Sequence, residues 1–226
     1  MHNETLQKNN LAKKLLKGSL PLILAGVINS IQMKIDQVMI NEILGSTEVG
    51  YYAVAVNLSA VWFSIGVIIC NSVFPAIINA KKISEELYYL RIQKLFIFLV
   101  AISYALSISV YFLSEKIISV LYGEVFISAA PVLAIQIFSV IFVYLGVSSG
   151  RWMISENKSV LNLYRNLLGV IVNILANIFL IKKYGIIGAA YASLLAYIVS
   201  FYIFDIFTKK TRKIFIMKSK SLCFLR

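Results

Sequence analysis

Charged residues are scarce in this sequence. Its 226 residues are 14% charged and 60% apolar, whereas a soluble domain has about 25% charged and about 45–50% apolar residues. The apolar residues also come in blocks of about twenty or more, the length that a helix needs to cross a bilayer. The composition therefore predicts an all-α membrane protein rather than a soluble domain.

Histidine and cysteine are scarce as well, which argues against several kinds of site. His2 is the single histidine, and Cys70 and Cys223 are the two cysteines, too few for a histidine-based metal site or a disulfide framework. The sequence has no phosphate-binding Gly-rich loop ending in Lys-Ser/Thr, no potassium-channel filter and no regular arginine repeat of a voltage sensor. We therefore expect no cofactor, no metal and no enzymatic activity.

The long apolar segments predict six transmembrane helices, because about 20 residues cross a hydrocarbon core of about 30 Å. The spans cover residues 18–44, 49–79, 92–113, 128–150, 161–181 and 185–207. This divides the chain into a basic N-terminal segment (1–17), a six-helix bundle (18–207) and a basic tail (208–226). The long second span predicts a tilt or a break near Pro75. Residues 114–126 are amphipathic and fit either a helix on the outer surface or a loop with one helical turn.

The basic residues lie mostly on one side of this predicted bundle. One side holds Lys8, Lys13, Lys14, Lys17, Lys81, Lys82, Arg91, Lys94, Arg151, Lys158, Arg165 and the basic tail, and the other holds Lys116, Lys182 and Lys183. Lysine and arginine collect on the cytoplasmic side of membrane proteins, so both termini are predicted to be cytoplasmic. The net charge of +12 is then explained by a membrane, and we expect no nucleic-acid partner.

The segment "SIQMKIDQVMI" (30–40) places two charges, Lys34 and Asp36, inside the first span. Asn29, Gln32 and Asp36 share one face of a helix, and Lys34 points to the far side, so the two charges do not pair within it. Each charge needs a partner on another helix or in a water-filled cavity, which makes both functional candidates. The alternative is that both side chains extend to the outer membrane interface.

Polar residues also form stripes on two other predicted spans. Asn57, Ser64 and Asn71 repeat every seven residues in the second, and Asn166, Asn173 and Asn177 share one side of the fifth, which begins near Arg165. Such stripes fit hydrogen bonds between helices or the lining of a hydrated cavity. The sixth span instead carries a face of small residues that predicts close helix packing. This face consists of Gly185, Ala189, Ala192, Ser193, Ala196 and Ser200.

Several segments resemble a known family when they are taken in order. Residues 20–59, "LPLILAGVINSIQMKIDQVMINEILGSTEVGYYAVAVNLS", are similar to the start of the second half of bacterial polysaccharide flippases. These belong to the multidrug/oligosaccharidyl-lipid/polysaccharide exporter superfamily. "LYGEVF" (121–126), "PVLAIQIF" (131–138) and "NILANIFLIKKYGIIGAAYAS" (173–193) follow in the same order. The resemblance covers about residues 15–205.

The resemblance implies a two-lobe exporter of which this chain is one six-helix lobe, the C-terminal half. It implies translocation of undecaprenyl-diphosphate-linked oligosaccharide across the bacterial inner membrane. The chain would be a fragment, a split-gene product or a shortened remnant, working with a missing N-terminal half or with a second copy. A drug or small-ion antiporter of the same superfamily and a non-transporting membrane subunit remain alternatives.

The chemistry of such a substrate assigns roles to the candidate residues. A diphosphate is bound by Lys or Arg, for which Lys34, Arg151 and Arg165 are candidates. Arg151 and Arg165 are placed at the cytoplasmic mouth, where anchoring at the membrane surface is their alternative role. Sugar hydroxyls are bound by amides, and the candidates are Asn29, Gln32, Asn57, Asn71, Asn173 and Asn177. Lys34 and Asp36 would handle the headgroup in the outer half or couple an ion.

Overall fold

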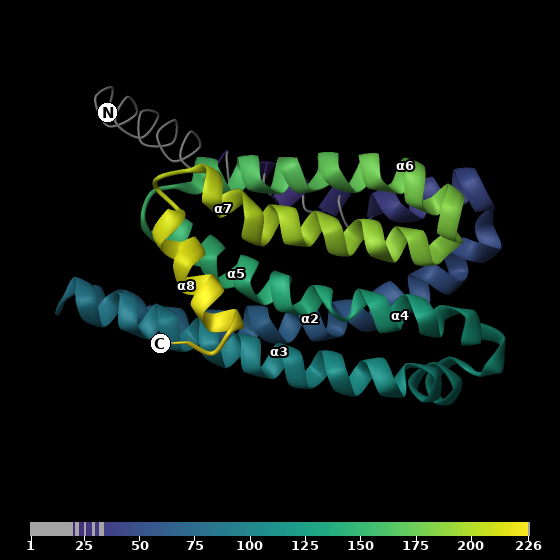
Figure 1. Cartoon of the computed structure of the whole chain (residues 1–226), viewed down its shortest axis with the longest axis horizontal. Helices are drawn as coiled ribbons and strands as arrows, with labels where there is room; N and C mark the ends of the chain where they lie inside the picture. The colour runs from purple at the N-terminus through teal and green to yellow at the C-terminus, as the bar shows by residue number, and fades with distance from the viewer. Residues whose placement is uncertain (1–19, 21–22, 25, 29, 32–33, 226) are drawn as a thin grey trace, which may run out of the picture.

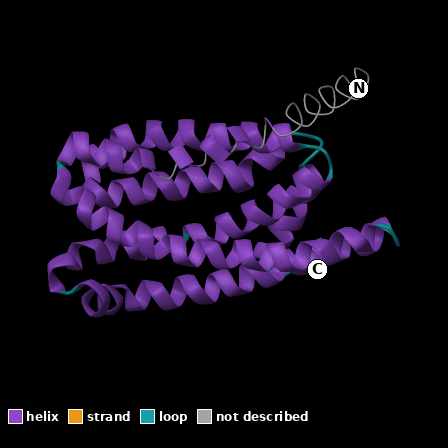
Figure 2. Ribbon diagram, turned by 180° about the vertical axis from the view of Figure 1, so that it is seen from behind, coloured by secondary structure: helices purple, strands orange, loops and turns teal. Residues whose placement is uncertain are grey.

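The computed structural model describes residues 20, 23–24, 26–28, 30–31 and 34–225, and it is helical in all its regular elements. Residues 34–44 are helical. The later helices are α2 (Ser46–Lys81), α3 (Glu85–Tyr122), η1 (Glu124–Ala129), α4 (Ala130–Gln136), α5 (Ser139–Ser155), α6 (Ser159–Ile198), η2 (Val199–Ile203), α7 (Phe204–Phe207) and α8 (Arg212–Leu222). The long helices run side by side, and α8 lies at one end of the bundle (Figures 1 and 2).

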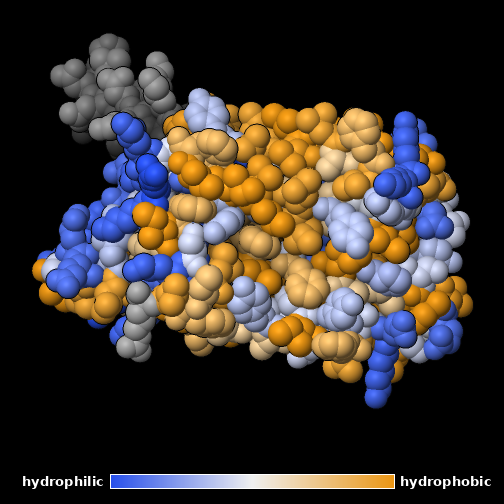
Figure 3. All heavy atoms as spheres, in the orientation of Figure 1, coloured by the Kyte–Doolittle hydropathy of each residue, from blue (hydrophilic) through white to orange (hydrophobic). Residues whose placement is uncertain are grey.

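The bundle has the surface of a membrane protein. Hydrophobic residues cover its middle, and hydrophilic residues gather at both ends (Figure 3). Among the described residues, three helices are long and apolar enough to cross a membrane, at Ser46–Lys81, Glu85–Tyr122 and Ser159–Phe207. A fourth span results if Glu124–Gln136 and Ser139–Ser155, which meet at a bend of 50°, are taken together. The all-α membrane class is therefore confirmed, whereas the count of six stays a prediction because the first span lies partly outside the described residues.

The longest helical segment reverses direction at Gly185. Gly185 has φ 62° and ψ −143°, a backbone conformation that glycine adopts without steric cost. Asn173 and Ser193 are 20 residues apart, yet Asn173 Nδ2 lies 3.4 Å from Ser193 Oγ. In a straight helix they would be about 30 Å apart. The reversal falls where the sequence separates the fifth and sixth spans.

The structure also bears on two regions for which the sequence left alternatives. α2 continues unbroken through Pro75, which excludes the break there, and the tilt of the second span stays a prediction. α3 continues to Tyr122 because Ser114 and Ile118 extend its buried face, so residues 114–122 are neither a separate surface helix nor a loop. α3 ends at Gly123, whose φ of 84° stops the helix.

The loops expected on one side of the membrane meet at one end of the bundle. Lys81 at the end of α2 forms an ion pair of 2.6 Å with Glu156, just after α5. Lys158, just before α6, donates a hydrogen bond of 3.4 Å to the carbonyl oxygen of Lys210. The same end carries α8, where Ile214 and Met217 are buried against neighbours that include α3. Which side of the membrane this end faces stays a prediction.

Candidate functional site

Asp36 is 3% exposed and accepts hydrogen bonds from three side chains on other parts of the fold. Tyr52 Oη donates to Oδ2 at 2.6 Å. Ser193 Oγ donates to the same oxygen at 2.5 Å, and Asn177 Nδ2 donates to Oδ1 at 2.6 Å. The expected partner on another helix is thus present. Three donors fill much of the acceptor capacity of the carboxylate and offset part of its desolvation.

Asn173 extends this group into a network that joins the two arms of α6. Asn177 Nδ2 also donates to Asn173 Oδ1 at 3.2 Å, and Asn173 Nδ2 reaches Ser193 Oγ at 3.4 Å. Asn173 and Asn177 are fully buried. Their stripe therefore makes hydrogen bonds between helices in this structure, the first of its two sequence-based interpretations.

The other candidates of the first span are not seen in contact with Asp36 among the described residues. Lys34 is exposed, so it lies apart from the buried network. Asn29 and Gln32 lie outside the described residues, which leaves their stripe with Asp36 untested. Of the two neighbouring charges, Asp36 is therefore the one that the bundle encloses.

Arg165 forms a second buried polar centre. Its side chain is 2% exposed, and its place at the cytoplasmic mouth stays a prediction. Nη1 donates to Ser149 Oγ at 2.8 Å, and Nη2 donates to the carbonyl oxygen of Gly146 at 3.1 Å and to Asn162 Oδ1 at 2.6 Å. The guanidinium carbon also lies 4.9 Å from the centre of the Phe201 ring, within the range of a cation–π contact.

A pocket of about 420 Å³ opens beside this arginine. Its polar lining includes Arg151, Asn162, Arg165 and Asn166. Gly150 also lines it, and a Cβ at this position would lie 3.2 Å from Arg165 Nη2. The buried atoms Arg165 Nε and Asn166 Oδ1 have no hydrogen-bond partner among the described residues. The pocket thus combines two cationic side chains, one of which has an N–H donor without a partner, an arrangement that can hold an anion.

The amides of α2 lie outside the buried networks. Asn57 and Asn71 are both exposed, and Arg151 Nη2 donates a hydrogen bond to Asn71 Oδ1. This contact extends the polar lining of the pocket onto the face of α2. The structure thus brings Arg151, Arg165 and Asn71 toward one region and leaves Asn57 apart from their contacts.

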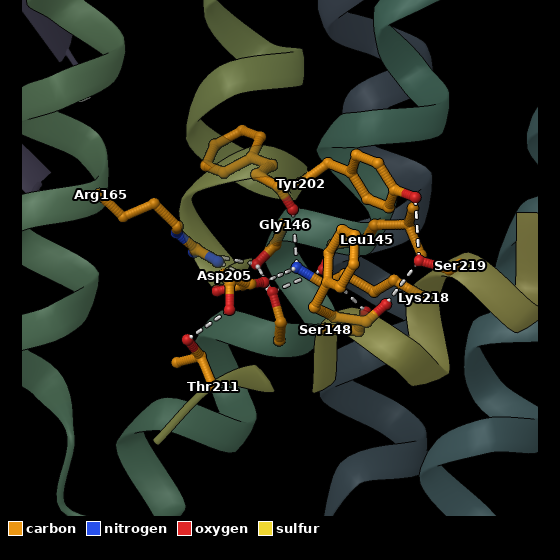
Figure 4. A network of polar contacts seen from close by, with 12 residues as sticks. Leu145, Gly146, Ser148, Arg165, Tyr202, Asp205, Thr211, Lys218 and Ser219 are labelled. Atoms are coloured by element: carbon orange, nitrogen blue, oxygen red, sulfur yellow. Dashed lines mark hydrogen bonds and ion pairs between the residues drawn. The ribbon is translucent and has the colours of Figure 1, made fainter. Parts of the chain in front are cut away.

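Lys218 and Asp205 form a buried ion pair next to Arg165 that the sequence analysis did not identify (Figure 4). Lys218 Nζ lies 2.6 Å from Asp205 Oδ2 and donates to the carbonyl oxygen of Phe201 at 2.7 Å. Burial lowers the pKa of Lys218 to about 8, because desolvation of the ammonium outweighs the opposing attraction of Asp205.

The sequence analysis did not identify Asp205, Ser193 and Lys218 as site residues, and their sequence context differs in how clearly it points to a buried polar site. Asp205 is an acidic residue within an apolar run, the signal that singled out Asp36, and it could have been found. The sequence places Ser193 on a face of small residues that predicts helix packing, and it places Lys218 among the charges of the basic tail. Among the described residues, no group of three or more His, Cys, Asp or Glu side chains could hold a metal ion.

Comparison with known proteins gives two distant relatives. One is a probable low-salt glycan biosynthesis flippase of Haloferax volcanii, 25% identical over 169 residues, which are 73% of this chain and 35% of the relative. The other is a capsular polysaccharide biosynthesis protein of Staphylococcus aureus, 24% identical over 192 residues, which are 80% of this chain and 47% of the relative. The matches therefore cover less than half the length of either relative. No solved structure matches.

Residues 5–131 match the family described as "Polysaccharide biosynthesis protein", which is more than half of this chain. Together with the two relatives, this match confirms the resemblance to polysaccharide flippases that the order of the sequence segments indicates. The chain belongs to the polysaccharide biosynthesis protein family of membrane proteins.

Proposed function

We propose that this chain forms one wall of a flippase that carries lipid-linked oligosaccharides across the bacterial plasma membrane. The substrate is an undecaprenyl-diphosphate-linked repeat unit, which moves from the cytoplasmic to the outer leaflet. The observation that carries the proposal is the cationic pocket beside Arg165, inside a bundle with an apolar surface. A buried cation is costly in a membrane protein and is expected where it serves a substrate or an ion.

The diphosphate of the substrate would bind at Arg165 and Arg151. Arginine presents several N–H donors that match the oxygens of a phosphate. Arg165 Nε is buried without a partner among the described residues, and Gly150 leaves the space next to Nη2 open. A larger residue at 150 would crowd the guanidinium and narrow the pocket.

The glycan would pass along the exposed amides of α2. Asn57 and Asn71 face outward from the bundle, and Asn71 already contacts Arg151 at the pocket. Amides donate and accept hydrogen bonds, as sugar hydroxyls require. A path that begins at the pocket and continues along α2 would keep the headgroup and the glycan on one face of the chain.

Asp36 would couple an ion or a proton rather than bind the headgroup. It is 3% exposed and is enclosed by Tyr52, Asn177 and Ser193. A bulky headgroup could not reach the carboxylate without separating these partners, whereas a proton or a small cation could. Lys34, which is exposed, remains a candidate for headgroup contact in the outer half.

The working transporter would contain a second lobe. The chain matches 35% and 47% of the two relatives, and Asn57 and Asn71 of α2 are exposed. A matching N-terminal half or a second copy would cover that face and complete the cavity, since the lobes of two-lobe transporters can be related by an axis along the membrane normal.

The test is to express this chain with a matching first lobe in a flippase-deficient strain and to measure surface glycan display. We expect the pair to restore display and the chain alone to fail. In the pair, Arg165→Gln and Arg151→Gln should each reduce display at unchanged protein abundance. Arg91→Gln is the matched control, because Arg91 contacts the carbonyl oxygen of Ala76 away from the pocket.

Normal glycan display with both pocket arginines replaced would contradict the proposal. A drug or ion antiporter would instead confer drug or ion tolerance that does not depend on a lipid-linked sugar. The two pocket arginines argue against a cationic drug as substrate, because like charges repel in a site of low dielectric constant.

A further inference from the structure

Two buried cations lie close to one carboxylate behind the pocket. Lys218 of α8 and Arg165 of α6 both neighbour Asp205 of α7 (Figure 4). Asp205 and Lys218 are fully buried, and Arg165 is nearly so. The cluster therefore carries one positive charge in excess when all three side chains are ionised. Asp205 supplies the single negative charge, so the cation with which it pairs decides which of the two stays unpaired.

The geometry assigns Asp205 to Lys218. Lys218 Nζ lies 2.6 Å from Asp205 Oδ2, whereas the hydrogen bonds of Arg165 go to the neutral acceptors Ser149, Gly146 and Asn162. Asp205 Oδ1 and Arg165 Nε both lack a hydrogen-bond partner among the described residues. Within that part of the chain, the two ion pairs are Lys218–Asp205 and Lys81–Glu156, so Arg165 faces the pocket without a paired carboxylate.

The docking of α8 delivers Lys218 to this position. Gln93 of α3 donates to the carbonyl oxygen of Met217 at 3.1 Å and to Ser221 Oγ at 2.8 Å. Tyr202 Oη lies 2.9 Å from Ser219 Oγ. Tyr202 belongs to η2, a π-helical turn, and such wide turns occur frequently at functional sites. Lys218 inserts at this turn and contacts the carbonyl oxygen of Phe201.

We propose that Lys218 is a positioning residue for the anion site at Arg165. By pairing with Asp205, it keeps this carboxylate from neutralising Arg165 and leaves the guanidinium available to a diphosphate. If Lys218 is withdrawn, Asp205 pairs with Arg165 and competes with the anion. This inference rests on the proposed diphosphate role of Arg165, and it makes that role depend on the docking of the C-terminal helix α8.

The test measures the binding of inorganic pyrophosphate and of farnesyl diphosphate to the purified chain in detergent micelles by calorimetry. Lys218→Met keeps a long side chain without its charge, and we expect binding weakened about tenfold, as a change of about 1.4 kcal/mol would give. The double variant Asp205→Asn/Lys218→Met removes the competing carboxylate as well. We expect it to bind nearly as tightly as the wild type, and weak binding in the double variant would overturn the inference.

A crosslinked form separates charge from helix placement. Gln93→Cys and Ser221→Cys would join α3 to α8 in a Cys223→Ser background, which removes the exposed native thiol. We expect Lys218→Met to weaken binding equally in the crosslinked protein. Recovery of binding through the crosslink alone would overturn the inference, because the position of α8 would then suffice.

The anion site itself is tested by Arg165→Gln. Wild-type binding in this variant, or a wild-type protein that binds neither probe, would contradict the proposed diphosphate site. Loss of binding in Arg165→Gln with normal binding in Lys218→Met would overturn only the role of Lys218. Tighter binding of farnesyl diphosphate than of pyrophosphate supports a lipid headgroup as ligand, and equal binding contradicts that source.

Discussion

At Asp36, one buried carboxylate organises side chains from three segments of the chain. Tyr52 reaches it from α2, and Asn177 and Ser193 reach it from the two arms of α6. Without the carboxylate, Tyr52 and Ser193 would lose their acceptor, and Asn177 would keep only its bond to Asn173. The acidic group and its donors therefore stabilise the fold only as a set, which links the structural and the proposed ion-coupling roles of Asp36.

Replacing Asp36 tests how far the bundle depends on this set. Asp36→Ala leaves three buried donors without their acceptor, and each such group costs about 1–3 kcal/mol before partners rearrange. We expect a loss of about 3 kcal/mol and a clearly lower thermal midpoint in detergent. Asp36→Asn should lose less, because an amide still accepts one of the bonds. Lys34→Ala, at an exposed position, is the control, and an equal loss there would contradict the distinction between the two charges.

The sequence could predict that Asp36 has a partner, but not which one. A charge in an apolar span must be compensated, whereas the identities of Tyr52 and Ser193 depend on how distant helices pack. The burial of Arg165 could not be predicted either. Its acceptors include Ser149 and the carbonyl oxygen of Gly146, and a backbone acceptor leaves no residue type for a sequence pattern to detect.

Among the elements, the reversal within α6 depends on small residues as well as on the conformation of Gly185. A Cβ at Gly188 would lie 2.0 Å from the carbonyl oxygen of Leu180, a contact with backbone that cannot move aside easily. The predicted small-residue face of the sixth span is buried at Ala189, Ala192 and Ala196, and its Ser193 also joins the Asp36 network. The same helix face therefore packs closely and contributes a hydrogen-bond donor to Asp36.

Gly188→Ala should therefore destabilise the protein by about 1–3 kcal/mol, the usual cost of overpacking. Gly50→Ala is the matched control, because a Cβ there meets nothing within 4 Å and alanine favours a helix interior by about 1 kcal/mol over glycine. Thermal unfolding should thus shift in opposite directions for the two variants. Equal shifts would mean that the Gly188 contact does not restrict the turn.

The contact that joins the ends of α2 and α3 to the end of α5 should respond to pH. Burial opposes ionisation of Glu156, but hydrogen bonds from Lys81 and Tyr88 outweigh it and lower the pKa of its carboxyl group. A carboxyl group with a lowered folded pKa stabilises the fold above its unfolded pKa and loses that contribution as pH falls through the folded value.

Glu156→Gln should accordingly lower stability by about 0.5 kcal/mol at pH 7, a typical value for a surface pair. The gap in thermal midpoint between wild type and variant should persist down to about pH 5 and shrink at lower pH. A gap that stays constant down to pH 3 would show that the charge of Glu156 contributes nothing. Glu115→Gln, on the surface at the other end of α3, controls for general charge effects.

For the whole molecule, composition predicted the class and the long apolar runs predicted two of the long helices. The spans at 49–79 and 92–113 fall within α2 and α3, since an uninterrupted apolar run of this length has few other stable forms in a membrane. The C-terminal helix α8 was not predicted, because its sequence is short and basic. Its docking brings Lys218 to Asp205, and these two residues lie in different regions of the predicted chain, the tail and the sixth span.

The orientation of the bundle can be tested with a residue that the chain already contains. Cys223 is exposed and Cys70 is buried, so a thiol reagent should label the native protein at Cys223. Basic segments gather at the end that carries α8, and the positive-inside rule places this end in the cytoplasm. A membrane-impermeant reagent should therefore label Cys223 only after cells are permeabilised.

The opposite end should show the opposite behaviour. Val120 is 74% exposed near the end of α3, so Val120→Cys in a Cys223→Ser background should be labelled in intact cells. Labelling of Cys223 in intact cells would reverse the orientation. The Arg165 pocket lies near the end that carries α8, so that result would place it at the outer leaflet. The proposed binding of the diphosphate before translocation would then have to be replaced by binding after it.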